Sequence, residues 1–335
     1  MTKRTLAAIA GALTLAAAPL AHAQLALTPD GTSLGFTLST FVSGYNFGGN
    51  YGPLSQGVAS NGNIITGSVG NGNIYVFHDV DGQTLASAIS ATPYGCQTGN
   101  CNWSMATVAG QVYGAQAFGG VFEKFADNGT FAPVPGLASV TGYLGMWADP
   151  ANGHLIASSS AGLIDYNPTL GTFRVIASVF PDGVSVSPDG SIAYLENGGA
   201  IQSYDITSGA LIHTFATGHS PDGTGVITGG TLNGDVVVNN NDGTLGLLDP
   251  TKADGNPLQY RLIATGGTRG DFTSPDTTNG TLFISQTERV DRLSCGENCS
   301  IGTVNPVPEP ETYALMLAGL GALGWVARRK KRSAR

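Results

Sequence analysis

Between its two ends, the chain consists of short runs in which bulky hydrophobic residues occupy alternate positions. Ile192 and Tyr194 are such positions in one run, and Val236 and Val238 in another. Because successive side chains of a β-strand point to opposite faces, this period of two is typical of half-buried strands. Asn-Gly and Asp-Gly pairs separate many of the runs and indicate tight turns. The pattern predicts an all-β protein of many short strands.

The runs form a unit that repeats along the chain. The segment from Gly183 to Phe215 contains a strand, a turn, a second strand, a third strand led by glycine, a turn and a fourth strand, and the segment from Gly145 to Ile176 has the same order. Further units begin at Gly57 and Met105. Four strands at a period of about 40 residues are typical of a β-propeller blade. The first turn glycine of each unit recurs at intervals of 37 to 48 residues, at Gly62, Gly110, Gly153, Gly190, Gly234 and Gly280.

Six units must close into a ring, and the last unit supplies only three strands before Cys295. The segment Ser33 to Val42 is a lone strand near the start of the chain. Pairing this strand with the last unit would remove the exposed edges of an open array. We therefore expect a six-bladed β-propeller, with seven blades as the alternative if residues 25–53 contain another partial unit.

The N-terminus has the three parts of a secretory signal peptide. Lys3 and Arg4 precede the apolar run Leu6 to Leu20, and Ala21-His22-Ala23 forms a small-residue cleavage site. We expect residues 1–23 to be a signal peptide and the exported chain to begin near Gln24.

The C-terminus ends in an apolar run and a basic cluster. Tyr313 to Ala327 contains 15 residues without a charge, and as a helix it would be about 22 Å long, which is shorter than the roughly 30 Å of a bilayer core. Basic side chains at its end can extend to the lipid surface and help a short helix to span. Such a cluster stays on the cytoplasmic side, which predicts a single transmembrane helix with the body outside. The basic cluster comprises Arg328, Arg329, Lys330, Lys331 and Arg332.

Pro308, Glu309 and Pro310 precede this helix, and the three parts together resemble a PEP-CTERM sorting signal. The resemblance covers the last 30 residues and implies a Gram-negative bacterium that makes extracellular polysaccharide. It implies that exosortase, a membrane protease-transpeptidase, recognises the Pro-Glu-Pro motif and removes the tail. We then expect a transient inner-membrane anchor with the body in the periplasm, followed by delivery to the cell surface or matrix. A plain C-terminal anchor is the alternative. The predicted domains are the signal peptide 1–23, a propeller 24–303 and a sorting signal 304–335.

Charge limits the partners of the body. Gly is frequent (49 of 335 residues), while charged residues make up 11% and apolar residues 41% of the chain. Without the two terminal signals, the body retains seven Lys and Arg against 21 Asp and Glu, a net charge of −14. Such a surface repels nucleic acid and tolerates cations or neutral sugars. The charge therefore excludes nucleic acid, and the resemblance to the PEP-CTERM signal implies extracellular polysaccharide as a partner.

Four cysteines form two close pairs, Cys96 with Cys101 and Cys295 with Cys299. In an oxidising compartment, such pairs are typical of disulfides. Three connectivities are available, of which we favour the two local ones, and a zinc site is the alternative.

The body loosely resembles the six-bladed SMP-30/gluconolactonase and NHL-like propellers in its blade rhythm and in turns such as Ser-Pro-Asp-Gly. In such a ring, the loops between blades and those between second and third strands gather at one face. The candidate residues on this face are Asp182, Asn197, His219, Asp222, Asn240, Asp242, Arg269 and Asp271, with Trp103, Tyr143 and Trp147 on the other side of the same rim.

Three interpretations of this rim remain open. Its oxygen-bearing side chains suit Ca²⁺, and a metal-activated water would support lactone hydrolysis. The first blade, however, begins Gln56-Gly57-Val58 and lacks the acidic ligand of the lactonase pattern. Alternatively, aromatic rings and Asp or Asn side chains bind sugars by stacking and hydrogen bonding. The third interpretation is that the tryptophans are core and the polar residues form turns. We expect no catalytic residue and no resident cofactor. His78 to Gln83 is expected to form a hairpin turn.

Overall fold

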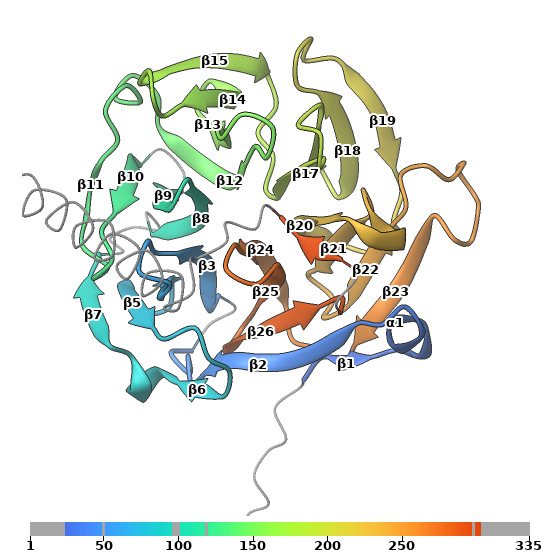
Figure 1. Ribbon diagram of the computed structural model, residues 1–335, viewed down its shortest axis with the longest axis horizontal. Coiled ribbons are helices and arrows are strands. Elements are labelled where there is room, and N and C mark those ends of the chain that lie inside the picture. Colours follow the sequence, from blue (N-terminus) through green and yellow to red (C-terminus); the bar gives the residue numbers. More distant parts are fainter. Residues whose placement is uncertain (1–23, 49–50, 96–100, 118–119, 297–298, 303–335) are drawn as a thin grey trace, which may run out of the picture.

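Six antiparallel blades surround a central axis in the computed structural model, which describes residues 24–48, 51–95, 101–117, 120–296 and 299–302 (Figure 1). Besides strands, these residues form one short helix, α1 (Pro29–Ser33), and two 3-10 turns, η1 (Leu85–Ser87) and η2 (Gly230–Leu232). The six-bladed, all-β prediction is confirmed.

Several predicted features lie outside the described residues. They are the signal peptide (1–23), Cys96, the Pro308-Glu309-Pro310 motif and the basic cluster 328–332. The domain boundaries therefore remain predictions. Within the described ranges, no helix has the length and apolar character needed to cross a bilayer. Cys295 and Cys299 form a disulfide with their Cα atoms 5.8 Å apart, as predicted.

Each blade runs from an inner strand beside the axis to an outer strand at the periphery. From inside to outside, the first three blades are β3 (Pro53–Val58), β4 (Ile64–Ser68), β5 (Asn73–Phe77) and β7 (Ser90–Pro93); β8 (Asn102–Val108), β9 (Gln111–Gln116), β10 (Phe122–Phe125) and β11 (Phe131–Pro133); and β12 (Gly142–Ala148), β13 (Leu155–Ser159), β14 (Gly162–Asn167) and β15 (Thr172–Ala177).

The other three blades follow in chain order, and the inner strands of neighbouring blades contact one another all around the ring. These blades are β16 (Val184–Val186), β17 (Ile192–Asn197), β18 (Ala200–Asp205) and β19 (Leu211–Phe215); β20 (Pro221–Thr228), β21 (Val236–Asn240), β22 (Leu245–Leu248) and β23 (Tyr260–Thr265); and β24 (Gly270–Asp276), β25 (Thr281–Gln286), β26 (Arg289–Ser294) and β2 (Thr37–Ser43).

The N-terminal segment closes the ring, as the sequence predicts. Strand β2 pairs antiparallel with β26, from Thr37 opposite Ser294 to Ser43 opposite Arg289. Strand β1 (Ala26–Leu27) adds a further outer strand to the fifth blade through β23. On its other edge, β2 pairs in parallel with β6 (Gln83–Thr84), which follows the third strand of blade 1. Blades 5, 6 and 1 are thus joined by residues far apart in the sequence.

Hydrophobic side chains pack between neighbouring blades and form the core. Tyr194 of β17 belongs to the same cluster as Val236 and Val238 of β21, and the partly buried Ile192 packs against this cluster. These are the alternate positions that predicted strands, and here the faces of blades 4 and 5 bury them against each other. Burial of this kind is the main favourable contribution to folding.

Candidate binding site at the channel mouth

The inner strands β3, β8, β12, β16, β20 and β24 all begin at the same end of the central channel, which we call the mouth. The opposite end is occupied by β27 (Ser300–Ile301), which pairs with the last residues of β20, Ile227 and Thr228. A Cβ atom on Gly302 would lie 2.4 Å from Pro275 and 3.4 Å from Trp147, so the chain here also touches blades 6 and 3. The last described residues therefore fill the end of the channel opposite the mouth.

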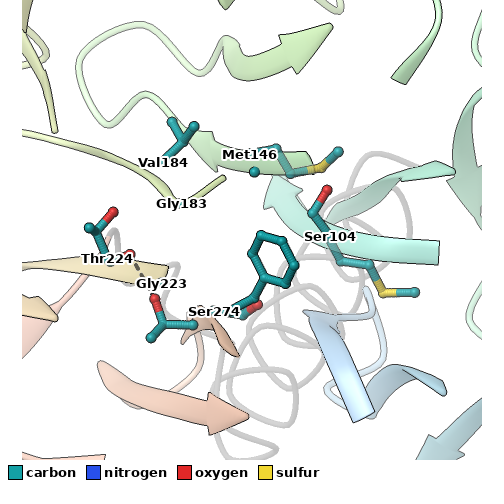
Figure 2. A pocket seen from close by; sticks show the side chains of 11 residues that line it. Ser104, Met146, Gly183, Val184, Gly223, Thr224 and Ser274 are labelled. Atoms are coloured by element: carbon teal, nitrogen blue, oxygen red, sulfur yellow. Dashed lines mark hydrogen bonds between the residues drawn. The ribbon is translucent and has the colours of Figure 1, made fainter. Parts of the chain in front are cut away.

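The channel interior is too narrow for a ligand. Its cavity measures about 10 Å³, with Ser104, Gly183, Gly223 and Ser274 among the lining residues (Figure 2), and such a volume accommodates about one water molecule. Glycine allows the inner strands to approach this closely, because a Cβ on Gly183 would lie 2.1 Å from the Asp222 carbonyl oxygen. Because β27 fills the opposite end, a larger ligand on the channel axis would have to bind at the mouth.

A shift in strand register occurs at the mouth end of the inner strand in blades 1, 2, 3, 5 and 6. In blade 4, the Asp182 N–H donates to the Glu196 carbonyl just before β16 begins. A β-bulge redirects a side chain relative to the regular strand. In each blade, one residue lies at this shift or, in blade 4, just before β16. We call these six residues the mouth ring. From blade 1 to blade 6 they are Leu54, Trp103, Leu144, Asp182, Asp222 and Asp271.

The first three members of the mouth ring are apolar and lie in one hydrophobic cluster. Leu54, Trp103 and Leu144 pack there together with Phe272 of blade 6. Tyr51 covers part of this cluster, with its ring centroid 5.1 Å from that of Trp103. Tyr51 itself remains 42% exposed, so it offers an accessible aromatic surface beside the mouth.

The other three members are acidic and share one arginine. Arg269 pairs with Asp271 and, at 3.3 Å, with Asp222. Its guanidinium also lies 4.6 Å from the centre of the Tyr51 ring, a favourable cation–π arrangement. Arg269 therefore connects the acidic half of the mouth ring with the apolar half.

Burial raises the pKa values of the three carboxyl groups in the acidic half. Desolvation, together with repulsion from Asp271 and Glu196, raises the pKa of Asp182 to about 8, although Arg269 partly offsets this. Desolvation and the neighbouring Asp271 and Asp182 also raise the pKa of Asp222. The pKa of Asp271 rises to about 6 through desolvation, against the opposing effect of Arg269. One guanidinium thus does not balance all the negative charge at the mouth.

Some oxygen atoms at the mouth also lack hydrogen-bond donors. Oδ1 of Asp182, Oδ1 of Asp222 and Oδ1 of Asn241 are buried with no partner among the described residues. Asn241 lies beside Asp222 and lowers its pKa by hydrogen bonding. Leaving such atoms unsatisfied costs about 1–3 kcal/mol each, so they favour a ligand that donates hydrogen bonds.

The structure separates the predicted rim into groups. Asp182, Asp222, Arg269 and Asp271 come together, and Trp103 lies across the mouth from them. Tyr143 packs against the apolar cluster, with its ring 5.7 Å from Phe180.

Four predicted residues lie elsewhere. On blade 5, His219 Nδ1 is 2.6 Å from Asp242 Oδ2, and Asn240 donates to the Tyr260 hydroxyl at 2.9 Å. On blade 4, Asn197 donates to Gln202 at 3.0 Å.

Trp147 lies apart from the mouth. It is 1% exposed and packs in the core near Ile227 and Ile301, toward the end filled by β27. The residue therefore has a structural role in packing.

The described residues contain no group of three or more His, Cys, Asp or Glu side chains arranged to hold a metal ion. Gln56, where the lactonase pattern has an acidic ligand, is fully buried and donates to Ser285 Oγ and to the Pro53 carbonyl. Blade 1 thus presents no carboxylate from β3 toward the channel.

Five residues at the mouth were not predicted from the sequence, namely Tyr51, Glu196, Leu54, Leu144 and Phe272. Leu54 and Leu144 could have been found from the repeat. They occupy the position in their units that corresponds to Asp222 in the fifth unit. Tyr51 lies in a loop outside the repeat, and no periodic signal marks it.

A family model described as the PEP-CTERM protein-sorting motif matches residues 306–332, so the chain carries this motif. A PEP-CTERM motif is the recognition signal of exosortase and marks an exported protein. No curated protein sequence matches the chain.

Solved propellers resemble the body in fold. A calcium-binding regucalcin from Agrobacterium tumefaciens str. C58 is 11% identical, with a TM-score of 0.54 over 80% of this chain and 98% of that one. A gluconolactonase from Xanthomonas campestris is 12% identical, with a TM-score of 0.54 over 80% and 93%. A putative glucose dehydrogenase from Thermus thermophilus is 13% identical, with a TM-score of 0.54 over 78% and 100%. At these identities the similarity concerns the fold alone.

Proposed function

We propose that this exported protein works at the cell surface or in the extracellular matrix, where its channel mouth binds saccharide units of an extracellular polysaccharide without catalysing a reaction. The observation that carries the proposal is the exposed ring of Tyr51 next to buried carboxyl and amide oxygens that lack donors. Aromatic faces stack on the apolar faces of sugars, and the oxygens would accept hydrogen bonds from sugar hydroxyls.

Export and processing belong to the same proposal. The predicted signal peptide would start export, and the tail that carries the PEP-CTERM motif would hold the body in the periplasm until exosortase removes it. The net charge of −14 on the body suits a neutral or cationic polymer better than an anionic one.

A Ca²⁺-dependent lactonase- or lyase-like hydrolase is the alternative, since a gluconolactonase and a calcium-binding regucalcin share the fold. Two features of the mouth support binding over this alternative. Arg269 pairs with two of the three ring carboxylates that would otherwise face a cation. The first three blades present Leu54, Trp103 and Leu144 at the ring positions, and none of these side chains is a Ca²⁺ ligand.

Retention on polysaccharide purified from the producing organism tests the proposal. We expect the full-length chain in detergent to be retained and Tyr51→Ala to weaken retention by up to about tenfold, corresponding to the roughly 0.5–1.5 kcal/mol of an aromatic contact. Leu170→Ala is the matched control, because Leu170 is 71% exposed and lies in the turn between β14 and β15. A lactonase activity that disappears with a chelator and returns with Ca²⁺ would establish the alternative instead.

A further inference from the structure

The two halves of the mouth ring differ in polarity, so a single ligand would contact apolar side chains on one side and carboxyl groups on the other. Blades 1 to 3 contribute apolar side chains, which pack with Phe272 and Tyr51. Blades 4 to 6 contribute carboxyl groups from the same backbone position. A ligand that fills the mouth must therefore have one apolar face and one group that satisfies carboxylates.

The acidic half of the mouth ring has more carboxyl groups than positively charged groups. The three ring carboxylates interact there with the guanidinium of Arg269, and Glu196 adds a further carboxylate that repels Asp182. Asp222 is 2% exposed, and its Oδ1 has no partner among the described residues. A buried, unpaired carboxylate oxygen is costly, so the site favours a ligand that brings a cation or donors to it.

The oxygen atoms that lack hydrogen-bond donors indicate which chemical group of a ligand would satisfy them. The acceptors without partners are the Oδ1 atoms of Asp182, Asp222 and Asn241, of which Asp182 and Asn241 both interact with Asp222. A protonated primary amine has three N–H donors and no acceptor. A hydroxyl has one donor and brings further acceptors, and a carboxylate would be repelled.

From this geometry we infer that the mouth binds an amino sugar whose nitrogen is not acetylated. Its ammonium group would lie against Asp182 and Asp222, and an apolar face of the ring would lie on Tyr51. The inference rests on the proposed function, because it specifies which sugar units of the polymer the same site recognises.

Binding of an amine at this site releases protons. The groups that face the ammonium are Asp222 of β20, Asp271 of β24, Asp182 before β16, Glu196 of β17 and Arg269. The ammonium stabilises ionised carboxylates, so a proton held by Asp182, whose pKa is about 8, would pass to the buffer at pH 7. A neutral sugar would release none.

Calorimetric titration of the full-length chain in detergent tests this with glucosamine oligosaccharides and their N-acetylated counterparts. We expect the free amines to bind at least tenfold more tightly at pH 7. The heat measured in two buffers of different ionisation enthalpy should show proton release for the amines alone.

Asp182→Asn should weaken amine binding at least tenfold and abolish the proton release. Asp254→Asn should leave both unchanged, since Asp254 is an exposed partner of His213 away from the mouth. Circular dichroism of both variants checks the fold, which Asp182→Asn should leave intact because an amide of nearly the same shape replaces a carboxyl group whose pKa is raised to about 8.

Each outcome separates this inference from the proposed function. Equal binding of acetylated and free sugars overturns the amine while leaving saccharide binding in place. Retention on the organism's own polysaccharide without any binding of free amines would likewise overturn the amine and leave saccharide binding in place. Displacement of the amine by equimolar Ca²⁺ would reassign the carboxylates to a metal, and the absence of all sugar binding would overturn both proposals.

Discussion

Replacement of Arg292 is expected to destabilise the point at which the ring closes. This residue of β26 is 8% exposed in its side chain and is surrounded by three carboxylates. Its Nη1 lies 2.6 Å from Asp276 Oδ2, its Nε lies 2.9 Å from Asp81 Oδ1, and its Nη2 contacts Asp79. The guanidinium also lies 4.8 Å from the centre of the Phe283 ring. Arg292 thus joins blade 6 to the turn that follows β5 of blade 1.

The size of the effect follows from the burial of these groups. At about 4 Å and an effective dielectric constant of about 20, each ion pair contributes roughly 4 kcal/mol of attraction. Desolvation and repulsion among the carboxylates offset much of this. Removing the arginine leaves Asp276, which is fully buried, without its cation. Removal of one partner of a buried pair costs about 3–5 kcal/mol, so Arg292→Met should lower the midpoint temperature by about 10 °C.

Thermal and urea unfolding of the full-length chain in detergent measures this loss. Arg174→Met is the control, because Arg174 pairs with Asp165 at 2.9 Å but its side chain is 47% exposed, and exposed pairs contribute about 0–1 kcal/mol. Addition of Asp276→Asn to Arg292→Met should restore part of the stability. If both arginine variants lose less than about 1 kcal/mol, the buried ion cluster does not stabilise the closure and the reasoning fails.

Three further predictions concern stability. Because the folded-state pKa values of Asp182 and Asp271 lie above the unfolded value near 4, the folded state binds more protons between about pH 4 and 8. Urea titrations should therefore show stability falling as pH rises, by at most about 1.4 kcal/mol per pH unit for one proton, and Asp182→Asn should flatten the slope. Gly183→Ala should cost about 1–3 kcal/mol, because its Cβ would meet the Asp222 carbonyl; unchanged stability would show that the inner strands can separate. Ile301→Ala should cost about 2–4 kcal/mol if β27 packs in the channel as described, and a loss under 1 kcal/mol would contradict that packing.

The ring and its closure could be predicted because both depend on local, repeated signals. Turn glycines fixed the number of blades, and the lone strand near Ser33 to Val42 had to pair with the incomplete last unit. Strand β27 could not be predicted in this way. It has two residues and no periodic pattern, and it is held by its backbone pairing with β20.

The site was predicted only in part. Assigning a residue to a loop predicts which face of the propeller it lies on, but not how far it lies from the central axis. Asp222 and Asp242 were both expected on the rim, yet the bulge of β20 puts Asp222 beside Arg269, whereas Asp242 pairs with His219 on blade 5. Trp147 is three residues beyond Leu144 in the same strand. At about 3.3 Å per residue this is roughly 10 Å along the channel, which is enough to move a side chain from the mouth into the core.

The mouth ring explains how a shared fold can serve different chemistries. Each blade contributes one ring residue at or just before the start of its inner strand, while the strands that follow are packed against neighbouring blades. A substitution in the ring would therefore change the chemistry of the mouth, although the apolar members Leu54, Trp103 and Leu144 also pack in a cluster with Phe272 of blade 6. In this chain, three apolar and three acidic residues occupy the ring, and Arg269 neutralises part of the acidic half. Similarity to a lactonase or a calcium-binding propeller at 11–12% identity shows only that the strands are arranged in the same way. If the mouth binds a ligand as proposed, the choice between a metal, a neutral sugar and an amine would depend on the six ring side chains and on the arginine that contacts them.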